Sequence, residues 1–494
     1  MYSLIPSLVC DFYKTSHRNQ YPAGTENIYS IMVPRSNKYL NKVDRVVSAG
    51  VSGFVVKYLV DFFMQAFFAR PEEDVVREYS EFIKRTLGVD DDGSHIRELH
   101  QLGYLPLKIK AIPEGESVPI GTPILTIENT HSKFAWLTNY FETLISCSLW
   151  QPMTSASIAR KYYKLGFEFS DLTCDNDDHL KFQFHDFSMR GMSSLESAQI
   201  SGLGHLMYFN GTDTIPAITY VDEYYKGKFA KNFNPTSIPA TEHSVMCALV
   251  AKQEAYTGSR DETESYRHLI KDVYPEGFVS IVSDTYDFWH NIEHVLPSIK
   301  DDIMSRNGRV VIRPDSGDPV QIICGIPESE NSNAEEKGLI QALWDLFGGT
   351  INEKGYKVLD PHIGAIYGDS ITLERAEKIF AGLAAKGFAS SNIVFGIGSY
   401  SYQGNTRDSL GFAIKATSII QDGDEFSIMK DPKTDSGKKS PRGRVKVVGD
   451  SYIDGLSVNS DFQYDRLQTV FEDGVSRTIS IDDARNNVAI DVAF

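Results

Sequence analysis

The chain of 494 residues is too long for a single compact core, and two or three domains are expected. Hydrophobic residues make up 41% and charged residues 23%, as in ordinary globular proteins. A formal net charge of -17 disfavours binding to nucleic acid or to an anionic membrane surface. An anionic substrate would therefore require a local cluster of Arg and Lys side chains.

The cysteines and the N-terminal segment indicate a reducing, cytoplasmic environment. The five cysteines are scattered and never spaced as CxxC, which argues against a disulfide framework and against a zinc site. The first residues, MYSLIPSLVCDFYK, contain neither a basic segment nor a sustained apolar run, so no signal peptide is expected. Residues 51–70 are the most apolar stretch, but Lys57 and Asp61 interrupt it, and we predict an amphipathic core helix instead of a membrane span.

The flanks of the chain differ from its middle. Residues 40–105 have a helical pattern, and residues 106–128 alternate apolar and polar side chains between Pro and Gly, which predicts antiparallel hairpins. From residue 405 onward, predicted strands are mixed with a basic loop at 430–446. Residues 328–338 are polar and predict an exposed insertion.

Between about residues 180 and 400, short β-branched runs alternate with helical segments. We predict a strand over the whole of 181–187 and further strands within 278–284, 308–317, 363–370 and 392–398. Helices are predicted at 193–209 and 372–387, the second with Gly387 as its C-cap. This alternation implies parallel strands buried on both faces, in an α/β barrel or a doubly wound sheet. We favour the barrel.

Charged residues or glycines follow seven of the runs, at positions where the strand ends of a barrel carry its reactive groups. They are HDF at 185–187 with Arg190, GTDT at 211–214, Glu242 with His243, Asp284 with Asp287, Arg313 with Asp315, Gly368 with Asp369, and Gly396 with Gly398. Each has a simpler structural explanation, since a loop histidine or a Pro-Asp-Ser-Gly turn is common without any function. His243 becomes a candidate catalytic residue because neighbouring carboxylates raise the basicity of an imidazole and fix its tautomer.

The sequence contains the cations that an anionic substrate would need. They lie in or beside loops that contain Gly, Ser or Asp: Arg35, Arg190, Arg313, Arg407 and Lys415. Cations for phosphates, together with carboxylates for hydroxyl groups or Mg²⁺, describe a sugar-phosphate or nucleotide site. No GxxxxGK[ST] or GxGxxG motif is present, so neither a P-loop nor a Rossmann site is supported.

Nine motifs, in the same order and at similar spacing over nearly the whole chain, resemble the nicotinamide phosphoribosyltransferases of the type II phosphoribosyltransferase family. They are DFYKTSHRNQYP (11–22), HDFSMRGMSSLESA (185–198), GTDT (211–214), PATEHS (239–244), VSDTYD (282–287), VIRPDSGDP (311–319), YGDS (367–370), TRD (406–408) and MKDP (429–432). The resemblance implies transfer of a phosphoribosyl group from phosphoribosyl pyrophosphate to nicotinamide, with Mg²⁺ as cofactor. It also implies a homodimer whose active sites lie at the subunit interface.

The fold implied by the resemblance has three parts. An irregular α/β barrel would span 156–404, and an antiparallel sandwich-like domain would be built from 1–30, 106–155 and 405–494. A mostly helical segment would occupy 31–105.

The resemblance also assigns roles to individual residues. Phe187 and Tyr13 of the partner subunit would stack on the pyridine ring, and Asp213 would accept a hydrogen bond from the amide. Contacts to the base, phosphates and ribose are implied for Arg190, Arg313, Asp315, Gly368, Asp369, Gly398 and Arg35 and, from the second subunit, for Arg407 and Lys415. Mg²⁺ would be held mainly by substrate phosphates.

His243 would be phosphorylated by ATP, so that ATP hydrolysis is coupled to tighter substrate binding. Asp284 is the first candidate to orient its ring, and Glu242 is the second. Ser399 and Ala413 depart from the family pattern in phosphate-binding segments, at positions where glycine and serine are usual. Two alternatives remain open: a nicotinate phosphoribosyltransferase, which Asp213 disfavours, and a non-catalytic binding protein of the same fold.

Overall fold

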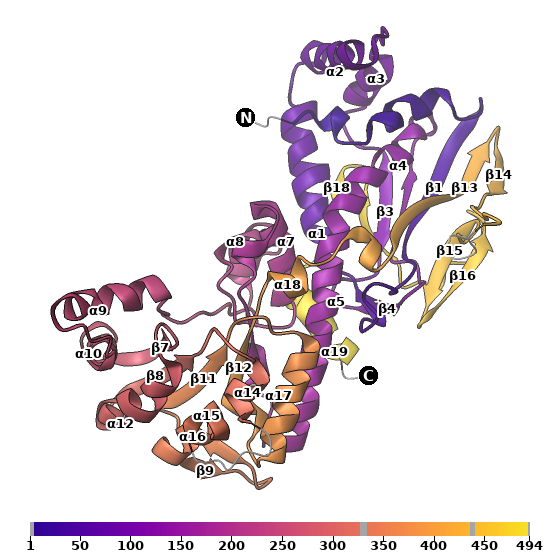
Figure 1. The fold of residues 1–494 in the computed structure, drawn as a ribbon. Coiled ribbons are helices and arrows are strands. Elements are labelled where there is room, and N and C mark those ends of the chain that lie inside the picture. Colours follow the sequence, from indigo (N-terminus) through magenta and orange to yellow (C-terminus); the bar gives the residue numbers. More distant parts are fainter. Residues whose placement is uncertain (1–3, 327–332, 435–439, 493–494) are drawn as a thin grey trace.

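Two β-sheets of different kinds lie at opposite ends of the protein (Figure 1). The computed structural model describes residues 4–326, 333–434 and 440–492. Helix α5 (Glu142–Thr173) runs from one end to the other and contacts elements of both, including β13 and α17. The expectation of an α/β fold with a separate antiparallel part is confirmed.

The antiparallel sheet brings the two ends of the chain together. Its order is β14 (Asp424–Ser427), β13 (Phe412–Gln421), β1 (Thr25–Pro34), β5 (Leu125–Asn129), β3 (Leu107–Ala111), β17 (Gln468–Glu472) and β18 (Val475–Ser476). The pairing of β3 with β5 confirms the predicted hairpin region at 106–128. Two small ribbons accompany the sheet: β2 (Arg45–Val47) with β4 (Ser117–Pro119), and β15 (Arg444–Val448) with β16 (Ser451–Leu456).

The predicted helical segment is present at the N-terminal side of this sheet. Its helices are α1 (Val51–Phe54), which continues as the π-helices η3 (Val55–Phe62) and η4 (Met64–Phe68), then α2 (Glu72–Leu87) and α3 (Ser94–Leu102). The helix Val51–Phe68 is long and apolar enough to cross a membrane, but 56% of it is buried in the protein. Its apolar side chains therefore serve the core, as predicted.

The parallel sheet forms most of a barrel. Its order is β6 (Phe184–Asp186), β12 (Ile393–Ile397), β11 (Ile363–Tyr367), β8 (Asn307–Arg313) and β7 (Glu276–Val282). Three single parallel bridges continue the ring: Asp186 with Thr212, Gly211 with Thr236, and Ala240 with Ser280. Short irregular segments thus span the side between β6 and β7, which makes the barrel irregular.

One predicted strand is shorter than expected. Residues 181–187 were expected to be a strand throughout, but α6 (Leu180–Gln183) occupies the first part and β6 begins only at Phe184. A short apolar run does not distinguish strand from helix by its period. The helical turn is fixed instead by tertiary contacts, since Nε2 of the buried Gln183 donates to the carbonyl of Ser390.

Helices alternate with the barrel strands as predicted. The main ones are α7 (Leu195–Leu206), α8 (Ile215–Tyr224), α9 (His243–Thr257), α10 (Thr263–His268), α14 (Pro319–Cys324), α16 (Leu339–Phe347) and α17 (Leu373–Ala385). Gly387 adopts a left-handed φ of 74° just beyond the end of α17, as expected for a helix stop. Of the predicted insertion, 328–332 lie outside the described residues, while Asn333 caps α15 (Ala334–Lys337).

Candidate active site

A cavity of about 420 Å³ lies inside the barrel, lined by residues of all five strands and of the bridging segments. Three of the predicted base-binding residues line it: Phe187, Asp213 and Arg313. They come from three separate loops or strand ends, which parallel pairing places at the same rim. The sequence-based expectation that these side chains converge is met.

Asp213 accepts two hydrogen bonds on the same oxygen. Nε2 of His185 lies 2.9 Å from Oδ1, and Oγ of Ser237 donates to the same atom at 2.5 Å. Burial alone would raise the pKa of Asp213, but these hydrogen bonds and the charge of Arg313 hold it below its usual value. Asp213 is therefore an anion at neutral pH, directed at the cavity.

His185 and Ser237 were not identified individually from the sequence. His185 belongs to the HDF motif, and Ser237 begins the segment that leads to His243. His185 lies inside the motif at 185–198, and Ser237 lies two residues before the motif at 239–244. Only the bridged loops of the barrel show that the two side chains meet at Asp213.

Two glycines make room for the Phe187 ring. A Cβ atom at Gly396 would lie 2.3 Å from Cδ2 of Phe187, and one at Gly368 would lie 3.2 Å from Cε2. The ring therefore rests directly on the backbone of β12 and of the loop after β11. Its other neighbour is the His185 ring, with centroids 5.0 Å apart. An aromatic face is thus fixed at the cavity rim.

Arg313 is a half-buried cation at the centre of the carboxylates. Its Nη2 donates to the carbonyl of Thr241 at 2.5 Å, and its buried Nε has no hydrogen-bond partner in the described part of the chain. Burial lowers the pKa of Arg313, against the opposing charges of Asp315, Asp213 and Asp284. A buried donor without a partner is suited to an anionic ligand.

His243 begins α9 and lies beside a buried carboxylate. Its Nε2 is 3.8 Å from Oδ1 of Asp284, and its Nδ1 is 3.1 Å from Oγ1 of Thr285. The other oxygen of Asp284 accepts from the backbone N of Asp315 and from Oγ of Ser316. Glu242 instead accepts a hydrogen bond from Ser244. Of the two candidate orienting groups, the structure places Asp284 next to the ring.

The remaining predicted barrel residues lie at the same rim. Arg190 is exposed on η6 (Met189–Gly191), which packs against α18 (Ser399–Tyr402). A Cβ atom at Gly191 would lie 2.0 Å from Oγ of Ser399, whereas one at Gly398 would meet no described atom within 4 Å. Asp369 is exposed after β11. The backbone of Gly398 is therefore open to a ligand.

Four predicted site residues lie on the other domain of the same chain. Tyr13 is on η2 (Phe12–Asn19), Arg35 follows β1, Arg407 begins η11 (Arg407–Ser409) and Lys415 is on β13. None of the four is among the described residues that line the barrel cavity. Within one chain, the predicted site is therefore divided into two groups.

Two members of this second group, Arg35 and Lys415, belong to a cluster of cations. Burial lowers the pKa of Lys415, Glu142 opposes that effect, and the charges of Arg35, Lys430 and Lys14 lower it further. Lys430 and Lys14 were not selected from the sequence, although both occur inside quoted motifs. The cluster has the character expected of a phosphate-binding surface.

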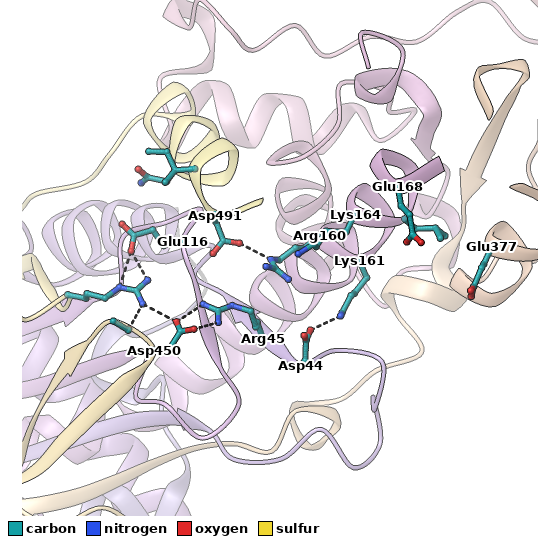
Figure 2. Close-up of a pocket in the computed structure, with 15 residues that line it drawn as sticks. Asp44, Arg45, Glu116, Arg160, Lys161, Lys164, Glu168, Glu377, Asp450 and Asp491 are labelled. Carbon is teal, nitrogen blue, oxygen red and sulfur yellow. Dashed lines mark hydrogen bonds and ion pairs between the residues drawn. The ribbon is translucent and has the colours of Figure 1, made fainter. Parts of the chain in front are cut away.

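A second hollow, of about 880 Å³, lies where the two domains meet (Figure 2). Several of its charged side chains form ion pairs: Arg160 with Asp491, Arg45 with Asp450, and Lys161 with Asp44. It contains none of the predicted site residues among those described. Although it is larger than the barrel cavity, ion pairs occupy much of its charged lining, and two of them involve α5, so we assign no substrate to it.

The comparison with known families bears directly on this site. Residues 182–475 match the nicotinate phosphoribosyltransferase (NAPRTase) family, and residues 7–109 match the nicotinamide phosphoribosyltransferase N-terminal domain. The chain belongs to the nicotinate phosphoribosyltransferase family. The family match covers all the barrel strands and also β13, which carries Lys415.

Two relatives from this family extend over most of the chain. A nicotinamide phosphoribosyltransferase from Acinetobacter baylyi is 45% identical over 98% of this chain and 97% of its own length. One from Mycoplasma pneumoniae is 36% identical, over 88% of this chain and 94% of its own length.

Solved structures support the fold. Nicotinate-nucleotide pyrophosphorylase from Pyrococcus furiosus matches with a TM-score of 0.59 at 13% identity, covering 100% of this chain and 97% of that chain. Human nicotinic acid phosphoribosyltransferase matches with a TM-score of 0.52 at 16% identity, covering 98% of this chain and 94% of that chain. At such identities, the matches inform on the fold alone.

Proposed function

We propose that this protein is a nicotinamide phosphoribosyltransferase that forms nicotinamide mononucleotide and pyrophosphate from nicotinamide and phosphoribosyl pyrophosphate, in NAD salvage. The observation that carries the proposal is the anionic Asp213 at the rim of the barrel cavity. A carboxylate accepts a hydrogen bond from the NH₂ of an amide and repels the carboxylate of nicotinate. Such repulsion costs several kcal/mol, and about 1.4 kcal/mol already gives tenfold discrimination.

The geometry also supports the transfer step. Phe187 offers one flat face to a pyridine ring, and Arg313 and Arg190 stand beside it at the rim. Breaking the bond between ribose C1 and pyrophosphate develops positive charge on the sugar and negative charge on the leaving group. Arginines would stabilise the leaving group, while Asp315 and Asp369 would lie near the sugar. The ring nitrogen held near C1 then attacks.

Mg²⁺ fits this site as a partner of the substrate phosphates. Among the described residues, no group of three or more His, Cys, Asp or Glu side chains is arranged to hold a metal ion. Asp284 has a buried Oδ1 that lacks a hydrogen-bond partner in the described chain, and Asp315 lies next to it through a backbone hydrogen bond. Since this Oδ1 faces His243, we expect the substrate phosphates, and not these carboxylates, to hold the ion, which would neutralise pyrophosphate charge.

Coupling to ATP would proceed through His243. The buried Asp284 next to Nε2 can hold that nitrogen's proton, which leaves Nδ1 as the nucleophile for a phosphoryl group. We expect His243→Ala to abolish ATP hydrolysis and to leave slow, ATP-independent nucleotide synthesis. Replacement of the exposed His268, which pairs with Asp272, is the matched control. Wild-type ATP hydrolysis in the His243→Ala variant would exclude the role.

A homodimer would complete the site. Tyr13, Arg35, Arg407 and Lys415 lie on the antiparallel domain, away from the barrel cavity of their own chain. Packing of that domain against the barrel of a second copy would supply the second aromatic face and more phosphate-binding cations. This arrangement accounts for the cation cluster around Lys415, which a single chain leaves at a distance from the base site.

The deciding experiment measures initial rates with each base. The protein is incubated with phosphoribosyl pyrophosphate, Mg²⁺ and either nicotinamide or nicotinate, with and without ATP, and the nucleotide formed is identified. We expect nicotinamide mononucleotide at a rate at least about tenfold above that of the acid product. A preference for nicotinate would assign the protein to the acid-specific activity. If neither nucleotide formed, a non-catalytic role would be favoured.

A further inference from the structure

A buried carboxyl group lies behind the His243 site. Glu262 directly precedes α10, and the residue is 1% exposed. Its Oε2 accepts a hydrogen bond of 2.6 Å from Nδ2 of Asn291, while its buried Oε1 has no partner among the described residues. A carboxyl group enclosed in this way is costly as an anion and stable as a neutral acid.

Asn291 connects this carboxyl to the loop of Asp284. The same Nδ2 donates to the carbonyl of Ser283 at 2.9 Å, and Ser283 immediately precedes Asp284. The backbone N of Ser283 in turn donates to the carbonyl of Arg313. Glu262 therefore braces, through one amide side chain, the backbone that places Asp284 beside His243.

The charges around Glu262 are anions. Burial, the largest cause, together with the charges of Asp284 and Asp261 raises the pKa of Glu262 to about 7, against the opposing hydrogen bond from Asn291. The hydroxyl of Tyr266, on α10 itself, is also buried nearby, and burial raises its pKa. The charges of Asp284 and Asp261 thus add to burial in favouring the neutral form of Glu262.

We propose that Glu262 is a proton-holding positioning residue for the His243 step: as a neutral acid it braces the loop of Asp284 and leaves one negative charge, not two, behind His243. The proposal rests on the proposed role of His243. ATP and phosphohistidine both bring negative charge to this place, and an ionised Glu262 would repel that charge. A neutral Glu262 keeps Asp284 as the single anion that orients the ring.

Three variants of the full-length enzyme separate these effects. Glu262→Gln keeps the acceptor for Asn291 and is permanently neutral, whereas Glu262→Ala removes the brace. Glu264→Gln is the matched control, since Glu264 lies only two residues further on, in the first turn of α10, but is exposed and paired with Arg267. ATP hydrolysis and ATP-independent nucleotide synthesis are measured for each between pH 5.5 and 8.5.

We expect wild-type ATP hydrolysis to fall as pH rises through 7. For each protein we divide the rate of ATP hydrolysis at pH 8 by the rate at pH 6. This quotient should be about tenfold higher in Glu262→Gln than in the wild type, which corresponds to a repulsion between ionised Glu262 and the phosphoryl group worth one pKa unit. Glu262→Ala should lower the rate at every pH, while Glu264→Gln matches the wild type. Synthesis without ATP should keep its wild-type profile in Glu262→Gln.

Thermal unfolding provides a readout that does not depend on ATP. The folded-state pKa of Glu262 lies above its unfolded value, so the wild type loses stability as pH rises from about 4.5 through 7. The Tm gain of Glu262→Gln over the wild type should therefore grow with pH across this window.

Two results would overturn the inference: a Tm gain that is independent of pH, or an unchanged pH profile of ATP hydrolysis in Glu262→Gln. A wild type that hydrolyses no ATP would instead remove the coupled activity itself and, with it, this role of Glu262. If the Tm gain of Glu262→Gln still grew with pH in that case, it would show that Glu262 is protonated in the folded protein, without a role in ATP hydrolysis.

Discussion

At the scale of single residues, the proposed base selectivity depends on the charge of one carboxylate, that of Asp213. Oδ1 of Asp213 receives hydrogen bonds from His185 and Ser237, and both favour its ionised form. Because the pKa of Asp213 is lowered, its negative charge persists over the whole neutral range. Base discrimination should therefore not depend on pH above about 5.

Replacing Asp213 by Asn should relax discrimination against nicotinate. The amide keeps the shape of the side chain but removes the charge that repels a carboxylate, so the ratio of kcat/KM values for the two bases should fall by at least about tenfold. Steady-state kinetics with both bases measure this ratio. Asp222→Asn, on helix α8 outside the cavity lining, is the control, and an unaltered ratio in Asp213→Asn would contradict the assigned contact.

At the scale of elements, the strands of the barrel determine where the aromatic ring can lie. Phe187 follows β6 and rests on Gly396 of the neighbouring β12 and on Gly368 after β11. The absence of side chains at these two positions lets the ring approach the backbone. The stacking platform is therefore a property of three adjacent strands.

Gly396→Ala should displace the Phe187 ring, because the new Cβ would lie 2.3 Å from Cδ2. We expect KM for nicotinamide to rise about tenfold and the free energy of unfolding to fall by about 1–3 kcal/mol. Gly368→Ala, whose Cβ would lie 3.2 Å from the ring, should have a smaller effect on both. Kinetics and denaturant unfolding measure the series, and equal effects of both variants would contradict the packing argument.

At the scale of the whole molecule, the two domains are joined by ion pairs as well as by α5. Arg160 on α5 pairs with Asp491 on α19 (Ile481–Val492), with side chains only 5% and 9% exposed. Asp44 and Lys161 form a more exposed pair in the same hollow (Figure 2). The C-terminal helix is thereby fixed to the long helix that both domains share.

Arg160→Met should destabilise the protein by about 3–5 kcal/mol, because it leaves Asp491 as an unpaired buried charge. Lys161→Met, which breaks the exposed pair, should cost at most about 1 kcal/mol. Chemical unfolding of both variants gives the comparison. Similar losses in the two would show that burial does not determine the strength of these pairs.

The proposed dimer makes a prediction for mixed subunits. We expect Asp213→Ala to inactivate the barrel group and Lys415→Ala to inactivate the group on the other domain. If each site uses one group from each chain, co-expression of the two inactive variants restores about a quarter of wild-type activity, because half the dimers are mixed and each has one intact site. Activity of the co-purified mixture measures this, and no recovery would contradict a shared site.

The sequence determined the local features of this protein. The alternation of β-branched runs with helical segments predicted a parallel barrel, and the polar residues after each run predicted its reactive rim. The structure confirms that Phe187, Asp213 and Arg313 share one cavity. These properties follow from short-range periodicity and from the rule that parallel strands end at one rim.

Only the tertiary structure decided the rest, because it depends on contacts between residues far apart in the chain. Residues 180–183 form a helical turn, fixed by the contact of Gln183 with Ser390. The bridges beside Gly211 and Ala240 bring His185 and Ser237 onto Asp213. The pairing of β1 with β13 places Arg35 and Lys415 on a domain of their own, separate from the barrel. Local sequence patterns do not encode such long-range pairings, which arise when distant segments bury their apolar faces together.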